Sequence, residues 1–260
     1  MRMTSAATLA FVLACTPPTL LAEQFRAAPR ELANNRDRAL VPYRLGFEHM
    51  RAEDFEKATR AFQQAVEIDP QFELAFYMLG RSYMAQKRYV EAISALTRSR
   101  DLYQAQAGQR FSNQQEAQRY RRDRVTEIDE IIRQYQTGPQ TQQTAEILRQ
   151  LNERRRQMME AIQRGSNFSL SNTVPAWVSL SLGSAYFRTE KFEDAEREYK
   201  AAIAADGRSG EAHNNLAVVY LLTGRADEAE KEVKAAEKAG FKVQPQLKED
   251  IKAAKKKATN

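Results

Sequence analysis

Residues 182–195 read LGSAYFRTEKFEDA, and residues 216–229, which begin 34 positions later, read LAVVYLLTGRADEA. The same step of 34 separates Leu45-Gly46 from Leu79-Gly80. Self-similarity at a fixed period of about 20 to 50 residues is typical of chains that stack copies of one small structural unit. Four copies of one template, two before and two after a long intervening stretch, therefore decide the fold.

Further residues recur in every copy, although the fourth copy has Leu216-Ala217 in place of the Leu-Gly pair. A histidine or tyrosine follows the leucine, and two small residues flank a bulky one further on: His49, Ala58, Phe62 and Ala65; Tyr83, Ala92, Leu96 and Ser99; Tyr186, Ala195, Tyr199 and Ala202; Tyr220, Ala229, Val233 and Ala236. This pattern resembles the tetratricopeptide signature. The resemblance implies an all-α tetratricopeptide α-solenoid, in which Gly or Ala lets the two helices of a repeat approach and the bulky residue fills the space between them. It covers residues 39–106, as repeats 1 and 2, and residues 173–241, as repeats 3 and 4.

The edges of the repeats predict where helices begin and end. Pro42 stands where a large aromatic is usual, and because proline is tolerated in a first turn we expect the helix to begin there. Gln104 replaces the terminal proline of repeat 2, so the second helix of that repeat can continue past Leu102. Residues 242–260 are expected to form a capping helix, Gln244 to Lys257, with a basic tail and one apolar face made of Leu247, Ile251 and Ala254.

The composition agrees with an all-helical chain. Only 10 glycines and 8 prolines occur in 260 residues, whereas Ala, Glu, Gln, Arg and Leu, which lose little on entering a helix, are abundant. The formal net charge is +6, with acids and bases mixed along most helical stretches. Such mixing is typical of solvated helix faces.

Residues 107–172 do not repeat the template and are expected to form an inserted helical hairpin. Two apolar stripes at helical spacing lie on either side of Gly138-Pro139: Val125, Ile128, Ile131, Ile132 and Tyr135, then Ile147, Leu148, Leu151, Met158 and Ile162. Gly138 can end the first helix, and Pro139 can occupy the first turn of the second. Each arm of about 24 residues would extend about 36 Å. The stripes either close the hairpin or support self-association of two chains.

The hairpin is rich in arginine and contains no lysine. Its arginines cluster near the base, with Tyr120 close by: Arg119, Arg121, Arg122, Arg124, Arg154, Arg155 and Arg156. Arginines and aromatic rings together can contact phosphates and stack on bases, which makes RNA or another polyanion an alternative partner. Interleaved acids, among them Asp129 and Glu153, favour intrahelical ion pairs on a solvated surface instead. The sequence therefore disfavours nucleic acid as a partner.

Residues 1–22 are expected to be a leader, and residues 23–38 a linker. Arg2 precedes an apolar run from Ala6 to Ala14, which has the length of an export signal and is shorter than the about 20 residues that span a bilayer. Val12-Leu13-Ala14-Cys15 resembles a bacterial lipobox, which implies lipidation of Cys15. Cleavage after Ala22 and an uncleaved leader on a cytoplasmic protein stay open as alternatives. We expect an exported protein of the periplasm or cell envelope, with such a lipid as its one membrane attachment.

In tetratricopeptide proteins the first helix of each repeat lines a concave groove, and the resemblance carries these positions over by register. The partner-binding residues that it implies are mostly aromatic or apolar: Tyr43, Phe47, Met50, Tyr77, Arg81, Met84, Trp177, Leu180, Phe187 and Asn214. Such a surface suits an apolar or amphipathic helix, or an extended peptide. The Lys, Asn and Arg set with which some relatives grip an acidic chaperone tail is absent. Burial of Tyr43, Phe47 and Trp177 by the N-terminal segment or by the hairpin is the alternative, because large apolar residues often only pack.

Sequence motifs for catalysis are missing. The chain has no P-loop, no G-x-G-x-x-G, no G-x-S-x-G and no H-E-x-x-H. His49 and His213 have no His or Cys at metal spacing, which predicts packing roles and no metal site. The sequence therefore predicts a non-catalytic scaffold that binds another protein or peptide and needs no cofactor. An intracellular adaptor that binds RNA through the hairpin is the alternative.

Overall fold

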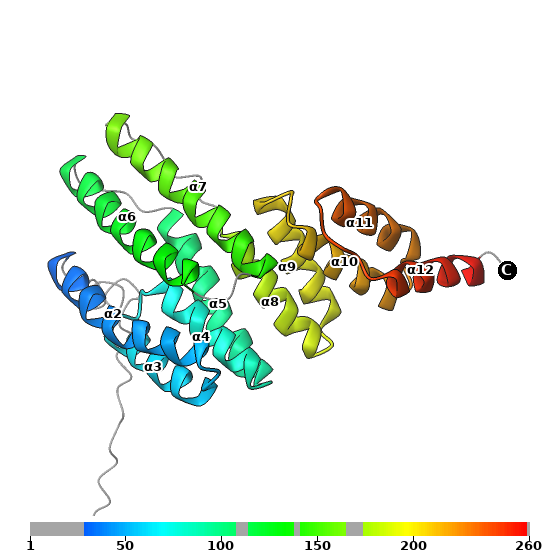
Figure 1. Ribbon diagram of the computed structural model, residues 1–260, viewed down its shortest axis with the longest axis horizontal. Coiled ribbons are helices and arrows are strands. Elements are labelled where there is room, and N and C mark those ends of the chain that lie inside the picture. Colours follow the sequence, from blue (N-terminus) through cyan, green and yellow to red (C-terminus); the bar gives the residue numbers. More distant parts are fainter. Residues whose placement is uncertain (1–28, 108–113, 138–140, 165–173, 259–260) are drawn as a thin grey trace, which may run out of the picture.

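The computed structural model describes residues 29–107, 114–137, 141–164 and 174–258, and every regular element in these ranges is an α-helix. Four helix pairs follow the 34-residue template: α2 (Pro29–Arg51) with α3 (Phe55–Ile68), α4 (Glu73–Ala85) with α5 (Tyr89–Ala107), α8 (Ala176–Arg188) with α9 (Phe192–Ala205), and α10 (Gly210–Leu222) with α11 (Ala226–Lys238). Between the second and third pairs lie α6 (Gln114–Gln136) and α7 (Gln142–Arg164), and α12 (Pro245–Ala258) ends the array. The expected all-α solenoid of two repeats, a hairpin, two repeats and a capping helix is confirmed (Figure 1).

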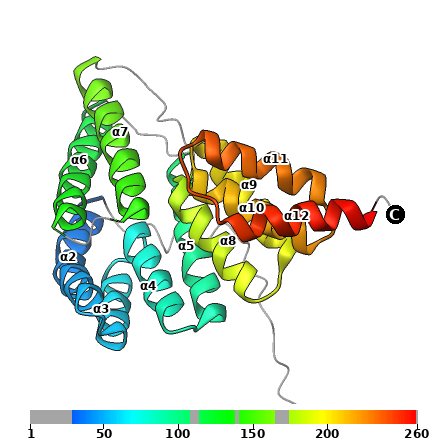
Figure 2. The same ribbon diagram turned by 45° about the vertical axis from the view of Figure 1, so that its right-hand side comes forward.

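The array of repeats continues across the insertion. Helix α5 of repeat 2 packs directly against α8 of repeat 3, although the whole hairpin lies between these two helices in the chain. Helices α6 and α7 lie side by side, outside the stack of pairs (Figures 1 and 2). The hairpin is therefore an excursion from the solenoid and takes the place of no repeat.

Each glycine of the repeated Leu-Gly pair lies where the two helices of a repeat touch. A Cβ atom added to Gly46 would lie 2.7 Å from the ring of Phe62, closer than Cβ atoms come to other groups. The same crowding occurs in repeats 2 and 3. A Cβ atom added to Gly80 would lie 2.5 Å from Leu96, and one added to Gly183 would lie 2.8 Å from Tyr199. The fourth repeat has Ala217 with the smaller Val233 as the bulky residue, and both are buried. Glycine and bulky residue therefore fit each other across the helix pair.

Helix α2 begins upstream of its expected start. The prediction of a start at Pro42 was wrong, because α2 begins at Pro29 and carries a buried Pro42 in its interior. An interior proline removes a backbone hydrogen bond and crowds the preceding turn. The turn before it is held from outside: Arg36 forms ion pairs with Asp69 and Glu73 and donates to the Gln71 carbonyl over 2.9 Å. Residues 29–38, which belong to the expected linker, are thus helical, and Arg36 among them contacts the start of repeat 2.

The other helix ends follow the sequence closely. Helix α5 runs to Ala107, as expected from the missing proline, and α12 covers the expected capping helix with Ile251 buried on its inner side. Helix α7 begins at Gln142, where Thr141 Oγ1 accepts a hydrogen bond from the Thr144 amide at 3.0 Å. Gly138 and Pro139 lie outside the described residues, as do the leader and Cys15. In the ranges that the structure describes, none of the helices has the length and apolar character to cross a membrane.

The buried apolar residues form two clusters. One joins repeats 1 and 2, the hairpin and part of α8, and the other joins repeats 3 and 4 with α12. The hairpin therefore shares its core with repeats 1 and 2 and with α8, the first helix of repeat 3.

A candidate interaction groove half covered by the hairpin

The first helices of the repeats, α2, α4, α8 and α10, lie next to one another and form one face, which we call the groove face. Because each helix presents every third or fourth residue to the same side, the register positions predicted from the sequence line this face. Its two halves have different surroundings. The half on α2 and α4 lies beneath α6, and the half on α8 and α10 does not (Figures 1 and 2).

Tyr135 of α6 is the centre of the contact between hairpin and groove face. Its ring lies 5.4 Å from that of Phe47, edge to face at 76°. Its hydroxyl donates to Met78 Sδ at 3.7 Å and accepts from Arg81 Nη1 at 3.4 Å. Burial raises the pKa of Tyr135, so the phenol stays protonated and keeps both bonds at neutral pH. An aromatic side chain of the hairpin thus lies against the groove face at Phe47, Met78 and Arg81.

The apolar stripes of the hairpin are buried where they were predicted. Ile131 is fully buried, Ile128 and Ile132 are nearly so, and Ile147 and Met158 of α7 face them from the other arm. These side chains belong to one cluster with Tyr43, Phe47 and Tyr77 of the repeats. The stripes therefore close the hairpin and at the same time attach it to repeats 1 and 2.

Ion pairs fix the base of the hairpin to the array. Arg124 of α6 lies 2.5 Å from Glu73 of α4, a carboxylate whose side chain is only 3% exposed and which also pairs with Arg36. Arg149 of α7 forms an ion pair with Asp206 at the end of α9, and Gln150 Nε2 donates to the same carboxylate at 3.3 Å. A buried carboxylate is stable only with such partners, so removing one partner is costly.

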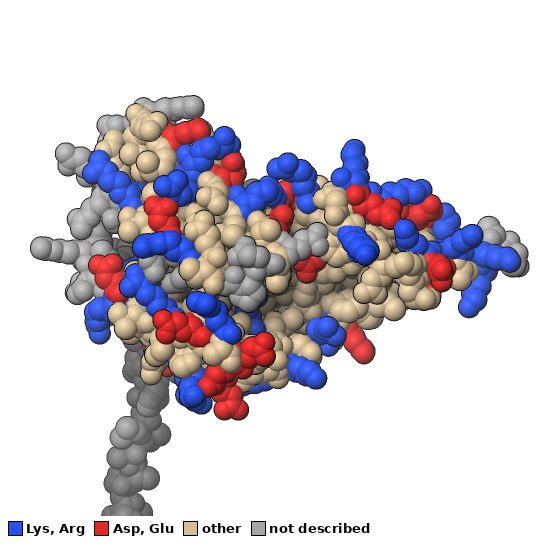
Figure 3. Space-filling model, viewed as in Figure 1, with Lys and Arg blue, Asp and Glu red and all other residues tan. Residues whose placement is uncertain are grey.

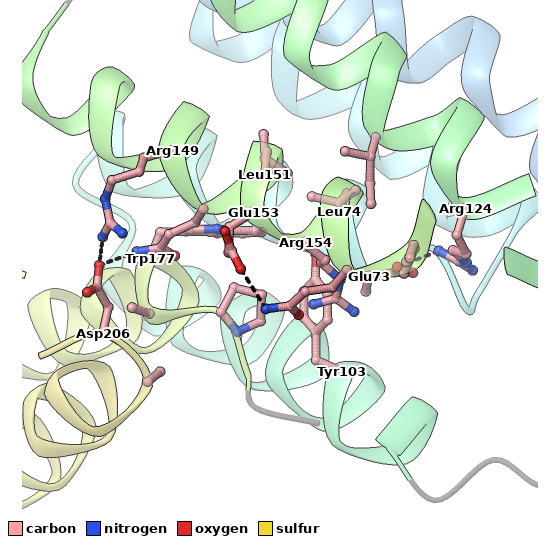
Figure 4. A pocket seen from close by; sticks show the side chains of 17 residues that line it. Glu73, Leu74, Tyr103, Arg124, Arg149, Leu151, Glu153, Arg154, Trp177 and Asp206 are labelled. Carbon is pink, nitrogen blue, oxygen red and sulfur yellow. Dashed lines mark hydrogen bonds and ion pairs between the residues drawn. The ribbon is translucent and has the colours of Figure 1, made fainter. Parts of the chain in front are cut away.

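A pocket of about 200 Å³ remains between α7 and the array (Figure 4). Its wall includes Trp177, Tyr103 and the ion-paired side chains just described. The Arg154 guanidinium lies 5.0 Å from the centre of the Tyr103 ring, a cation–π contact. Three arginines and three acidic residues line the pocket, so its charge favours neither an anionic nor a cationic ligand.

Five of the ten residues predicted to bind a partner are buried. Tyr43 is 0%, Tyr77 1%, Trp177 3%, Leu180 3% and Phe47 8% exposed. The Trp177 ring lies 4.3 Å from Tyr77 and 5.8 Å from Tyr103, so it joins repeat 2 to repeat 3. All five therefore pack within the chain in this conformation, and for Tyr43, Phe47 and Trp177 burial was the alternative to partner binding that the sequence left open.

The other five predicted residues, Met50, Arg81, Met84, Phe187 and Asn214, are partly exposed. Phe187 packs on Phe192 with ring centres 5.8 Å apart and keeps part of its ring at the surface. Asn214 donates to the Asn215 side chain at 3.3 Å. Arg81 lies at the boundary, since it touches Tyr135 of the hairpin and its charge also acts on Glu211 of α10.

The uncovered half of the groove face adds residues outside that set of ten. Leu222 is 57% exposed, Val218 and Leu221 are half-buried, and Arg188 is exposed. Glu211 is half-buried, and burial raises its pKa although the positive charge of Arg81 opposes the rise. This half can therefore offer apolar contacts together with one desolvated carboxylate.

Several described arginines of the hairpin have acidic neighbours. Arg156 lies 2.7 Å from Glu153, Arg155 pairs with Asp129 across the hairpin, and Arg149 also lies 2.8 Å from Glu146. Charges engaged in this way are less available to phosphate groups. The side chains of Arg119 and Tyr120 lie outside the described residues.

Neither histidine belongs to a metal-binding group in the described ranges. His213 Nδ1 lies 2.6 Å from Glu232 Oε2, and His49 is half-buried on α2. No set of three His, Cys, Asp or Glu side chains in the described ranges is arranged to hold an ion.

Sequence reasoning missed three parts of this site: Tyr135 as occupant of the groove face, and Arg36 and Arg124 as partners of Glu73. Tyr135 was visible as part of an apolar stripe, but a stripe shows only that a face is buried and not what covers it. The two arginines are 37 and 51 positions from Glu73, and no local spacing marks such pairs.

Comparison with known proteins agrees with the helical geometry. Two family models, both described as "Tetratricopeptide repeat", match residues 49–110 and 180–240. No match was found among curated protein sequences. Tetratricopeptide repeat proteins are in general non-catalytic scaffolds that bind other proteins or peptides.

Several solved structures are similar over most of the chain. PilW, described as a type IV pilus biogenesis factor, is 18% identical over 85% of this chain and 87% of its own, with a TM-score of 0.40. TTC0263, a tetratricopeptide protein of Thermus thermophilus, is 20% identical over 83% and 98%, with a TM-score of 0.35. YrrB, described as having an unusual peptide-binding site, is 15% identical over 84% and 92%, with a TM-score of 0.29. With its four helix pairs and two matched family models, this chain is a tetratricopeptide repeat protein.

Proposed function

We propose that the protein is a non-catalytic scaffold that binds an apolar or amphipathic segment of another protein on the uncovered half of the groove face. The observation that carries the proposal is the row of partly exposed apolar side chains on α8 and α10, formed by Phe187, Val218, Leu221 and Leu222. Large apolar side chains grouped on one face, beside polar groups, are typical of protein-binding surfaces. The hairpin leaves this row uncovered.

The chemistry of the surface limits the ligand. Phe187 and Leu222 can receive apolar side chains, while Asn214 and Glu211 offer an amide and a carboxylate for hydrogen bonds. A helix with one apolar stripe, or an extended peptide with alternate apolar residues, presents groups of this kind. Met84 and Arg81, at the edge of repeat 2, would extend the contact up to the hairpin.

The cell envelope is the proposed location. Its basis is the leader, with an apolar run of export-signal length ending at Cys15 in a lipobox-like sequence. N-terminal mass spectrometry of the protein purified from its native membranes tests this part separately. A chain that begins at Met1 and is found in the cytoplasm would exclude export.

Site-specific photocrosslinking in the native cell tests the binding surface even while the partner is unidentified. A photoreactive phenylalanine analogue is placed at Phe187, at Leu222 or, as control, at Val90, which is 73% exposed on the second helix of repeat 2. We expect one adduct of the same mass from positions 187 and 222 and none from position 90. Phe187→Ala should then abolish the adduct at 222, and Val90→Ala should not. Adducts from position 90 alone, or an adduct unaffected by Phe187→Ala, would remove the proposed site.

A further inference from the structure

The C-terminal end of the molecule carries nearly all of its net charge. From Lys238 to the end, the sequence contains seven lysines and two acids, a net charge of +5, whereas the whole chain has +6. This segment contains no arginine, in contrast to the hairpin, which contains no lysine. The charge asymmetry therefore belongs to one small part of the fold, α12 and the turn that leads into it.

The fold of α12 places these lysines at the surface. Its apolar side chains Leu247 and Ile251 pack on the cluster of repeats 3 and 4, and Ile251 is only 3% exposed. Lys248, Lys252 and Lys256 are spaced four residues apart, so they follow one another along a different flank of the helix. Helix α12 lies at the end of the molecule far from the hairpin, and basic side chains surround its tip (Figures 1 and 3).

Only part of this charge is used inside the protein. Lys248 lies 2.9 Å from Glu237, and Lys255 lies 2.8 Å from Asp227 and 2.5 Å from Glu230. Four further lysines are exposed and form no ion pair with any described residue: Lys238, Lys242, Lys252 and Lys257. The packing of α12 thus leaves a group of cations that intramolecular contacts do not neutralise.

We propose that this basic end, formed by Lys238 at the end of α11, the following turn to Val243 and α12, is a contact surface for an anionic lipid bilayer. Lysine is a compact, hydrated point charge, which suits the diffuse negative potential of a membrane surface. The apolar face of α12 is already engaged by α10 and α11, so the helix lies on the headgroups and does not insert.

A nucleic acid is the less suitable anion. Proteins that bind single strands combine basic grooves with exposed aromatic rings and with arginine. From Lys238 onward the only aromatic residue is Phe241, which is half-buried against repeats 3 and 4. The basic end therefore has the charge but not the stacking groups.

Co-sedimentation of the full chain with vesicles tests the proposal. The probes are vesicles of phosphatidylcholine alone and vesicles in which about a third of the lipid is anionic phosphatidylglycerol. We expect binding only to the anionic vesicles and a decrease with added salt. Each lysine near such a surface raises the affinity for the membrane about fivefold. The triple variant Lys242→Gln, Lys252→Gln, Lys257→Gln should therefore bind the anionic vesicles on the order of 100-fold more weakly.

A variant with the same loss of charge elsewhere is the control. Arg51, Arg60 and Arg122 are exposed and form no ion pair with a described residue, and their change to Gln should lower binding by less than about threefold, through net charge alone. Equal binding to both kinds of vesicle, or equal losses in the two triple variants, would overturn the proposal. Tighter binding of a single-stranded RNA than of the anionic vesicles would overturn the choice of lipid. Neither result depends on the groove face or its partner.

Discussion

The two halves of the groove face are built from the same 34-residue template and yet offer different surfaces. On repeats 1 and 2 the aromatic residues Tyr43, Phe47 and Tyr77 are buried, and Tyr135 of the hairpin lies among their neighbours. On repeats 3 and 4 the corresponding face keeps Phe187 and Leu222 partly exposed. Register within a repeat therefore defines a position on the groove face, but contacts with other parts of the chain, such as that of Tyr135 with Phe47, decide whether the side chain at that position is buried.

The largest expected effect is on the covered half. Tyr135→Ala removes a buried ring and two hydrogen bonds and leaves a cavity, which should lower the free energy of unfolding by about 3 to 5 kcal/mol. Phe187→Ala, on the uncovered half, should cost only about 1 kcal/mol because the ring is partly exposed already. Urea unfolding followed by circular dichroism measures both. If the two variants lost similar amounts of unfolding free energy, the covered and uncovered halves would not differ in burial as described.

The next effect concerns the ion pairs at the base of the hairpin. Glu73→Gln leaves Arg36 and Arg124 without their shared carboxylate and should cost about 3 kcal/mol. The matched control is Glu91→Gln on α5, whose exposed pair with Arg88 contributes little, so its unfolding curve should stay nearly unchanged. If Glu73→Gln unfolds at the same urea concentration as the control, the ion pairs do not hold the hairpin.

The smallest effect is a pH dependence of repeats 3 and 4, at an ion pair between α9 and the N-terminal end of α11, the second helices of these repeats. A hydrogen bond from Arg225, with help from Lys200, lowers the pKa of Glu196 from 4.5 to about 2. A carboxylate with a lowered pKa stabilises the fold above its unfolded pKa and loses this contribution as the pH falls from about 5 to 2. We expect about 1 kcal/mol, since Arg225 is a third exposed. Glu196→Gln should reduce the slope of stability against pH in this range, and an unchanged slope would assign it to other acids.

The local spacing of residues was enough to predict the repeats, the two arms of the hairpin and the capping helix. Gly46 and Phe62, or Gly183 and Tyr199, are 16 residues apart, and each pair meets because two short helices and a tight turn leave few other arrangements. The same reasoning gave the stripe from Val125 to Tyr135. These features are local, so the sequence carries their signal directly.

Contacts over long sequence separations were not predictable in this way. Tyr135 reaches Arg81 across 54 positions, and Arg36 reaches Asp69 across 33. The wrong start of α2 has the same cause: Pro42 disfavours the helix locally, but ion pairs and burial from repeat 2 favour it. The packing of Phe47 and Trp177 likewise depends on distant parts of the chain, since Phe47 contacts Tyr135 of the hairpin and Trp177 contacts Tyr77 and Tyr103 of repeat 2.

The rate at which introduced cysteines react with a maleimide tests the difference between the two halves most directly. With Cys15 changed to serine, a single cysteine is placed at Phe47 on the covered half, 8% exposed, or at Leu222 on the uncovered half, 57% exposed. We predict that Leu222→Cys reacts at nearly the rate of an unfolded chain and that Phe47→Cys reacts on the order of 100-fold more slowly, until Tyr135→Ala is added. Equal rates at the two positions, or a Phe47→Cys rate that does not rise with Tyr135→Ala, would contradict a groove face half covered by the hairpin.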